Sequence, residues 1–108
     1  MERLIETYLS YAPKAVQQLK AQFLVLNAAG LTAAAHSLKS SSANVGAMGL
    51  SALCRDLEAL TRIEGASVDD SCEQLVGLVE AEFDRVEAAL LALRIELGEA
   101  AAKSLASD

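Results

Sequence analysis

The last third of the chain carries the pattern that most constrains the fold. Between positions 72 and 97, apolar residues recur every three or four positions: Cys72, Leu75, Val76, Val79, Phe83, Val86, Leu90, Leu93 and Leu97. This spacing predicts one amphipathic helix of about seven turns. Ser67, followed by Asp69 and Asp70, marks its start as a cap with negative charge at the positive end of the helix dipole. Beyond Gly98 we expect a weak extension that frays over residues 98–108.

Shorter amphipathic segments precede this helix. Residues 2–11 predict a short helix that lies against the end of the domain, and Pro13 ends it and opens a second helix that runs to about residue 26. Residues 27–44 and 47–64 complete the set, since both carry apolar residues at helical spacing.

Three residues are placed to cap or end these two later helices. Asn27 is suited to cap the first of them with its side chain. Gly46 is placed to turn the chain between them, and Gly65 ends the second.

These segments predict an all-α fold, an antiparallel up-down-up-down four-helix bundle with a short additional N-terminal helix. The composition agrees, because 53% of the residues are hydrophobic but only 4% are aromatic, and Ala and Leu favour helix. Hairpin turns and alternating β-branched residues are absent from the sequence. We therefore expect one helical-bundle domain over residues 1–108.

Charge and cysteine usage exclude several classes of partner. The net charge of −6 argues against binding to nucleic acid or to an anionic membrane surface. No run approaches the about 20 apolar residues that a membrane span needs, and the N-terminus has no secretory signal pattern. Cys54 and Cys72 fall on the apolar sides of their helices, so we expect buried, reduced thiols, which fits a cytoplasmic protein. We also expect a monomer.

Metal and nucleotide sites lack their usual residues. One histidine and two separated cysteines form no ligand cluster, and no glycine-rich phosphate loop occurs. A helix start explains Asp69 and Asp70 better than a magnesium site, and close helix packing explains Ser41 and Ser42. We expect no metal, no cofactor and no kinase activity.

His36 is the candidate site. At about 100° per residue it points roughly 140° away from the apolar side of its helix, so it should face water. Ala33, Ser40 and Ala43 surround it at helical spacing, which leaves room for another macromolecule, and Lys39 lies one turn along, where its charge could hold an anion. A neutral imidazole is a nucleophile near pH 7. These features suit a phosphoryl acceptor.

The stretch around His36 resembles the signature of histidine-containing phosphotransfer (HPt) domains of multistep two-component phosphorelays. The resemblance rests on three parts: a His-x-Leu-Lys segment, a Gly-Ala turn, and a helix with Leu-x-x-x-Cys-x-x-Leu-Glu, here His36, Leu38, Lys39, Gly46, Ala47, Leu50, Cys54, Leu57 and Glu58. Helix order and chain length fit as well. One departure is Ser40, where the family commonly has Gly.

The resemblance implies a phosphorelay intermediate. His36 would accept a phosphoryl group from the phosphoaspartate of a receiver domain and pass it to an aspartate of a second receiver. Lys39 would balance the phosphate charge, and Ala33, Ser40 and Ala43 would lie on the docking face. The magnesium would belong to the receiver, and a hybrid sensor kinase could be the donor or the parent chain.

Two alternatives stay open. The chain could be a non-catalytic helical interaction module in which His36 is incidental. It could also be the phosphoacceptor histidine domain of a chemotaxis-type kinase, in which case the donor is an ATP-binding domain.

Overall fold

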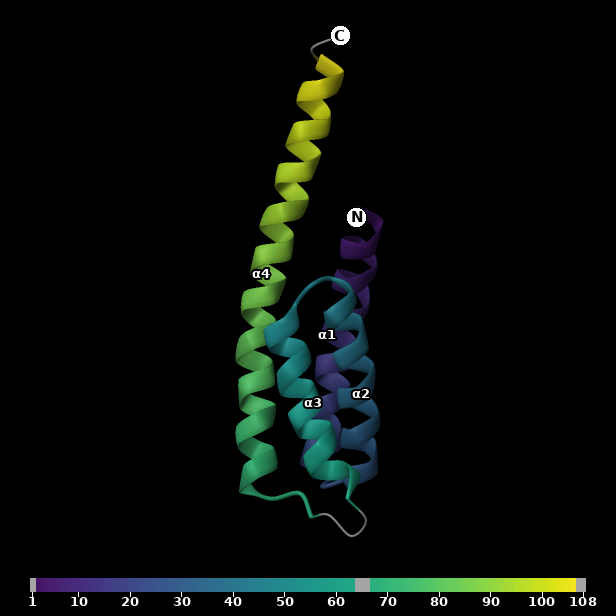
Figure 1. Cartoon of the computed structure of the whole chain (residues 1–108), viewed down its shortest axis with the longest axis vertical. Coiled ribbons are helices and arrows are strands. Elements are labelled where there is room, and N and C mark those ends of the chain that lie inside the picture. The colour runs from purple at the N-terminus through teal and green to yellow at the C-terminus, as the bar shows by residue number, and fades with distance from the viewer. Residues whose placement is uncertain (1, 64–66, 107–108) are drawn as a thin grey trace.

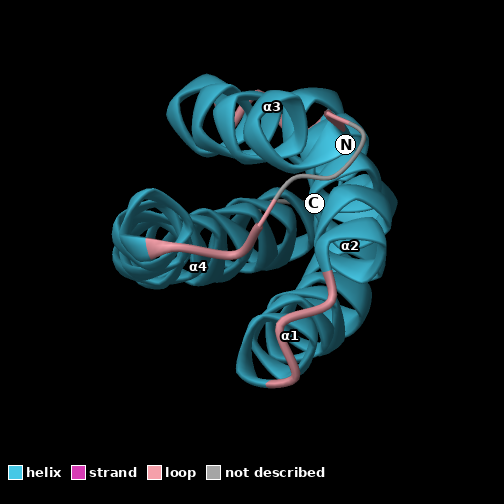
Figure 2. Ribbon diagram, turned by 90° about the horizontal axis from the view of Figure 1, so that it is seen from below, coloured by secondary structure: helices cyan, strands magenta, loops and turns pink. Residues whose placement is uncertain are grey.

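Four helices form an antiparallel bundle in the computed structural model, which describes residues 2–63 and 67–106 (Figure 1). They are α1 (Glu2–Leu24), α2 (Ala28–Asn44), α3 (Met48–Arg62) and α4 (Asp70–Ala106). Seen along the bundle, α2 lies between α1 and α3, and α4 lies across the core from α2 (Figure 2). The predicted all-α four-helix bundle is confirmed.

The prediction of a separate N-terminal helix is wrong, because α1 runs without a break from Glu2 to Leu24 with Pro13 inside it. A proline inside a helix costs about 3 kcal/mol, since one backbone hydrogen bond is lost. Ile5 and Tyr8, on the N-terminal side of Pro13, are only 2% and 3% exposed. Burying two side chains of that size contributes about 1.5–3 kcal/mol each, which offsets the loss.

The α1–α2 connection places Asn27 as the N-cap of α2, as predicted. Its Oδ1 accepts a hydrogen bond from the backbone N–H of Gly30 at 3.1 Å. The preceding Leu26 lies in the left-handed region with a φ of 54° and is largely exposed. The apolar pattern of α1 therefore ends before Leu26.

The α2–α3 connection turns on Gly46, also as predicted. Gly46 has a φ of 80°, a conformation that glycine adopts without strain. The N–H of Gly46 donates to the carbonyl of Ala43 at 3.0 Å, and the N–H of Ala47 donates to that of Ser42 at 2.9 Å. This pair of bonds is a Schellman motif, which ends α2 and sends α3 back along it.

The start of α4 differs from the prediction. Asp69, rather than Ser67, caps the helix: its Oδ1 accepts hydrogen bonds from the N–H groups of Ser71 and Cys72, at 3.1 and 3.4 Å. The helix then continues past Gly98 to Ala106 and projects beyond the other three (Figure 1). Gly65, the predicted end of α3, lies outside the described residues. We predict fraying over residues 98–108, but the chain is helical as far as Ala106, and residues 107–108 lie outside the described residues.

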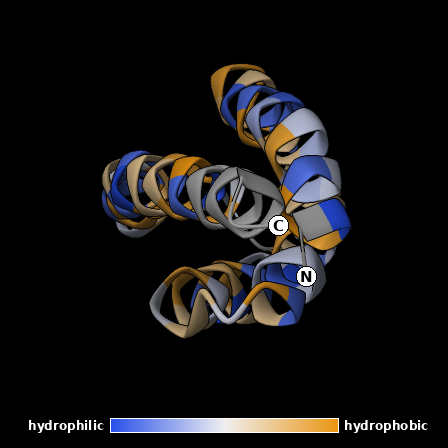
Figure 3. Ribbon diagram, turned by 90° about the horizontal axis from the view of Figure 1, so that it is seen from above, coloured by the Kyte–Doolittle hydropathy of each residue, from blue (hydrophilic) through white to orange (hydrophobic). Residues whose placement is uncertain are grey.

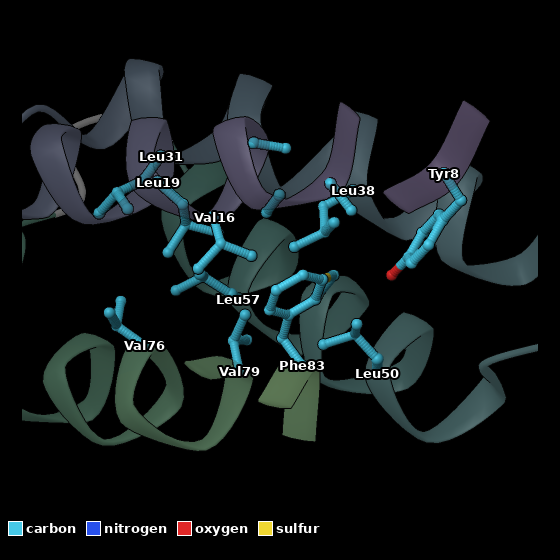
Figure 4. Close-up of a cluster of buried hydrophobic side chains, with 14 of the residues drawn as sticks. Tyr8, Val16, Leu19, Leu31, Leu38, Leu50, Leu57, Val76, Val79 and Phe83 are labelled. Carbon is cyan, nitrogen blue, oxygen red and sulfur yellow. The ribbon is translucent and has the colours of Figure 1, made fainter. Parts of the chain in front are cut away.

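The core is built from leucine and valine of all four helices, with few aromatic residues. Figure 4 shows side chains from each helix converging on Phe83 and Leu57, and Figure 3 shows apolar and polar residues alternating along the helices. Cys54 and Cys72 are fully buried and unpaired, as predicted. Within residues 2–63 and 67–106, no helix combines the length and the apolar character that crossing a membrane requires.

Candidate functional site

His36 lies in the middle of α2 and faces away from the core, as the sequence predicts. Its side chain is 60% exposed. Leu31, Ala35 and Leu38 of the same helix are completely buried, so α2 divides into an inner and an outer side. Ala33, Ser40 and Ala43 are exposed along with His36, which leaves the ring among short side chains.

The imidazole of His36 is hydrogen-bonded to a buried carboxylate of α3. Nδ1 of His36 lies 2.6 Å from Oε2 of Glu58. Glu58 is only 4% exposed. The two residues come from neighbouring antiparallel helices, so the α2–α3 hairpin brings them together.

Two cations share the other oxygen of Glu58. Nζ of Lys39 donates to Oε1 at 2.9 Å, and Nη2 of Arg62 donates to the same atom at 2.8 Å. The Lys39 ammonium therefore binds the Glu58 carboxylate in the unmodified protein. Both oxygens of Glu58 have partners, which a buried carboxylate requires.

These contacts keep Glu58 ionised. The hydrogen bond from Lys39 is the largest cause that lowers the pKa of the Glu58 carboxyl below its ordinary value, and the His36 bond and the charges of Lys39 and Arg62 act in the same direction. Burial opposes them and raises the pKa, but the partners prevail.

The ionised carboxylate determines which nitrogen of His36 carries the proton. A carboxylate can only accept hydrogen bonds, so in the neutral imidazole Nδ1 must hold the hydrogen that Glu58 binds. The lone pair then belongs to Nε2, on the opposite side of the ring. The arrangement therefore presents a nucleophilic nitrogen to the solvent.

Small polar residues on α3 let the two helices approach closely around this site. Ser51 Oγ donates to the carbonyl oxygen of Lys39 at 3.0 Å. Nearer the other end of α3, Thr61 and Thr32 share a hydrogen bond of 2.8 Å between their hydroxyls. These two contacts fix the register of the hairpin on both sides of Glu58.

Ser41 and Ser42, which follow His36 on α2, both have hydrogen-bond partners. Ser42 is buried, and its Oγ lies 2.9 Å from the hydroxyl of Tyr8. Ser41 donates its hydroxyl to the carbonyl of Ser37 at 3.0 Å. Neither hydroxyl lies on the outer side of α2 with His36.

Sequence reasoning assigned no role to Glu58, although it ends the motif that resembles HPt domains. A usable signal was present. A tight turn centred on Gly46 pairs residues at equal distances before and after it, so His36 should face the region around position 56 of the returning helix. Of the two acidic residues there, Asp56 is exposed and Glu58 is buried.

A groove between α1 and α2 opens beside His36. It has a volume of about 570 Å³ and is lined on the α1 side by Tyr11, Lys14, Gln18 and Gln22, and on the α2 side by Ala33 and Ser37. Short side chains on α2 leave this space open. A partner that reaches His36 from the α1 side would cover the groove.

The residues considered for metal binding do not cluster. Asp69 is used as the cap of α4, and Asp70 begins the helix. Over the described part of the chain, no group of three or more His, Cys, Asp or Glu residues lies close enough to hold a metal ion.

Comparison with known proteins identifies the family. A search of curated proteins and a search of solved structures each returned no match. A family model described as the Hpt domain matches residues 3–100, which covers nearly the whole chain, including α2, α3 and the His36–Glu58 pair. The chain therefore belongs to the Hpt family, whose domains take part in histidine phosphotransfer in phosphorelays.

Proposed function

We propose that this protein is a phosphorelay intermediate in which His36 is the phosphoacceptor. In this role His36 takes a phosphoryl group from the phosphoaspartate of a receiver domain and passes it to an aspartate of a second receiver. The observation that carries the proposal is the exposed imidazole whose Nδ1 is held by the buried carboxylate of Glu58.

The transfer is a direct displacement at phosphorus. The Nε2 lone pair attacks the phosphorus atom, and the bond from phosphorus to the receiver's aspartate oxygen breaks. The electron pair leaves with the aspartate carboxylate, and the proton stays on Nδ1. In the second step a carboxylate of the next receiver attacks the same phosphorus, and Nε2 recovers its electron pair.

Glu58 supports this reaction electrostatically. When Nε2 forms its bond to phosphorus, the ring becomes positively charged, because Nδ1 keeps its hydrogen. The Glu58 carboxylate lies 2.6 Å from that nitrogen and stabilises the charge as it develops. The protein itself supplies positioning and charge, which are the main requirements of phosphoryl transfer. We propose no kinase activity for this chain.

The receiver would dock on the outer side of α2 and the adjoining edge of α1. Ala33, Ser40 and Ala43 would lie against it, and a side chain of the receiver would enter the groove beside Tyr11 and Lys14. Small residues at these positions let the receiver's aspartate come close to Nε2. At Ser40, a hydroxyl stands where the family commonly has no side chain.

A labelling experiment tests the proposal. The protein is incubated with a receiver domain carrying radiolabelled aspartyl phosphate and magnesium, and the label on this chain should be acid-labile and base-stable. The His36→Gln variant should take up no label. Equal labelling of that variant would overturn the assignment of His36, and efficient labelling by a separate kinase ATP-binding domain without any receiver would favour the chemotaxis-type alternative.

The docking face needs its own variants. Ala33→Tyr and Ala43→Tyr should each slow transfer from the receiver, because added bulk keeps the aspartate away from Nε2. Ala81→Tyr on α4 is the matched control, since Ala81 is exposed and α4 lies across the core from α2 (Figure 2). If all three variants transfer at the same rate, the receiver does not dock on this face.

A further inference from the structure

Two cationic side chains bind the single negative charge of Glu58. One carboxylate oxygen, Oε1, accepts hydrogen bonds from both Lys39 and Arg62, while the other binds the imidazole of His36. A single carboxylate needs only one cation to be neutralised. The second cation is therefore available for another anion.

Lys39 and Arg62 approach Glu58 from opposite ends of the helix hairpin. The carbonyl of Lys39 accepts a hydrogen bond from Ser51, so Lys39 lies at the end of the hairpin that is nearer to the Gly46 turn. Arg62 follows Thr61, which is hydrogen-bonded to Thr32, so Arg62 lies near the open end of the hairpin. Either cation can therefore leave Oε1 without displacing the other.

The two cations differ in what else they can reach. Lys39 stands three residues after His36 on α2, which puts both side chains on neighbouring positions of one helix surface. Its side chain is 27% exposed and has a flexible four-carbon stem. Arg62 stands four residues after Glu58 on α3, where such a pair is favourable within the helix. Lys39 is thus the cation suited to move towards His36.

We propose that Arg62 is a positioning residue that keeps Glu58 in place when Lys39 leaves it for the phosphoryl group on His36. This inference rests on the proposed phosphoacceptor role of His36. In the unmodified protein both cations bind Oε1. In the phosphorylated protein Lys39 binds the phosphoryl oxygens, and Arg62 alone neutralises Glu58.

The exchange follows from the charges involved. A phosphoryl group brings about two negative charges to the outer side of α2. Lys39 can meet them only if Glu58 does not lose its last cation, because an unpaired buried carboxylate is strongly destabilised. With Arg62 present, Glu58 stays ionised and continues to hold Nδ1 of His36. Without Arg62, Lys39 has to serve two anions.

The test follows Lys39 directly by NMR. The chain has one histidine, so phosphoramidate, which transfers its phosphoryl group to imidazole with loss of ammonia, gives a single phosphohistidine. The Lys39 Cε signal, assigned with Lys39→Ala, is compared before and after phosphorylation at pH 8. It should shift on phosphorylation of the wild type and shift much less in Arg62→Ala.

Matched variants separate positioning from a general loss of charge. Arg55→Ala removes the same charge from an exposed position of α3 whose side chain reaches Asp56 at 3.5 Å, so it should behave as the wild type. Arg62→Lys should restore the Lys39 shift, because lysine can also pair with Glu58 at this spacing. Transfer from a phosphorylated receiver should be about threefold to tenfold slower in Arg62→Ala and unchanged in Arg55→Ala.

Two results would overturn the inference. The Lys39 signal could stay unchanged when the wild type is phosphorylated, which would mean that Lys39 does not leave Glu58. Alternatively, Arg62→Ala could match Arg55→Ala in both the NMR shift and the transfer rate. Because phosphoramidate needs no receiver, the NMR outcomes do not depend on whether His36 accepts a phosphoryl group from a receiver, whereas the transfer rate does.

Discussion

Nδ1 of His36 and Oε2 of Glu58 lie 2.6 Å apart, although 22 residues separate them in the chain. The imidazole that we propose as the phosphoacceptor belongs to α2, and the carboxylate that holds its Nδ1 belongs to α3. The chemistry of His36 therefore depends on the register between the two helices, which the Gly46 turn and the Ser51 and Thr61 hydrogen bonds maintain.

Replacing Glu58 by glutamine should slow phosphotransfer by on the order of tenfold to a hundredfold. The glutamine amide carries no charge to stabilise the phosphorylated ring. It can also donate to Nδ1, so the imidazole loses its preference for one tautomer. The rate of labelling by a phosphorylated receiver measures the first effect, and the ¹⁵N shifts of the single histidine measure the second.

Asp56→Asn is the control for this substitution. It removes the same charge from the same helix, but the Asp56 side chain is 55% exposed and its Oδ1 lies 3.5 Å from Nη2 of Arg55. It should leave both the rate and the tautomer unchanged. A Glu58→Gln variant that transfers as fast as the wild type would show that Glu58 does not support the reaction.

Glu58 should also make stability depend on pH. Its pKa in the folded protein is lowered from the ordinary value of 4.5, so the unfolded chain binds this proton more strongly than the folded protein does. The stabilisation is present above the ordinary pKa and is lost as the pH falls through the lowered, folded-state pKa. The free energy of unfolding, measured with urea, should be higher for the wild type than for Glu58→Gln, and this difference should become smaller below about pH 4.5. A difference that stays constant between pH 7 and pH 3 would contradict the lowered pKa.

The bundle could be predicted because each helix carries its own apolar pattern. The spacing from Cys72 to Phe83 predicts one buried side of α4, and the structure buries Cys72, Val76, Val79 and Phe83 there. Pro13 misled the prediction for a physical reason. Its effect on the backbone is local and visible in sequence, whereas the packing of Ile5 and Tyr8 that offsets it is tertiary.

The exposure of His36 could likewise be predicted, because it follows from the periodicity of one helix. The role of Glu58 depends on how two helices face each other. Its burial was not expected either, because a glutamate on an amphipathic helix is ordinarily solvated. Only the contacts with His36, Lys39 and Arg62 explain why the carboxylate is tolerated inside.

The core of α3 can be tested at Leu57, which is completely buried. Leu57→Ala should lower the free energy of unfolding by about 2–5 kcal/mol, because it removes apolar contacts and leaves a cavity. Leu78→Ala on α4 is the control, since Leu78 is 52% exposed, and it should change stability by no more than about 0.5 kcal/mol. Urea unfolding monitored by circular dichroism gives both values, and equal small changes would place Leu57 outside the core.

The two thiols should be inert in the folded protein. Burial, aided by the negative charge of Glu58, raises the pKa of the Cys54 thiol to about 12, and Cys72 is completely buried. The reactive species is the thiolate, so a disulfide reagent at pH 8 should modify neither cysteine until denaturant is added, after which two thiols should be titrated. Rapid reaction of one thiol in the native protein would contradict the described packing.

Substitution of Gly46 tests whether the α2–α3 turn helps to hold His36 against Glu58. Gly46→Ala should destabilise the protein by about 1–2 kcal/mol, because alanine is strained at a positive φ. A β-carbon there would meet no atom within 4 Å, so the loss reports backbone conformation alone. Gly77→Ala, in the third turn of α4 and with the same open surroundings, should instead stabilise the protein by about 0.5–1 kcal/mol. If the strained turn shifts α3 along α2, the imidazole signals of His36 should change in Gly46→Ala and stay as in the wild type in Gly77→Ala. Unchanged signals in both variants would show that the packing of α2 on α3 holds the His36–Glu58 register without help from the turn.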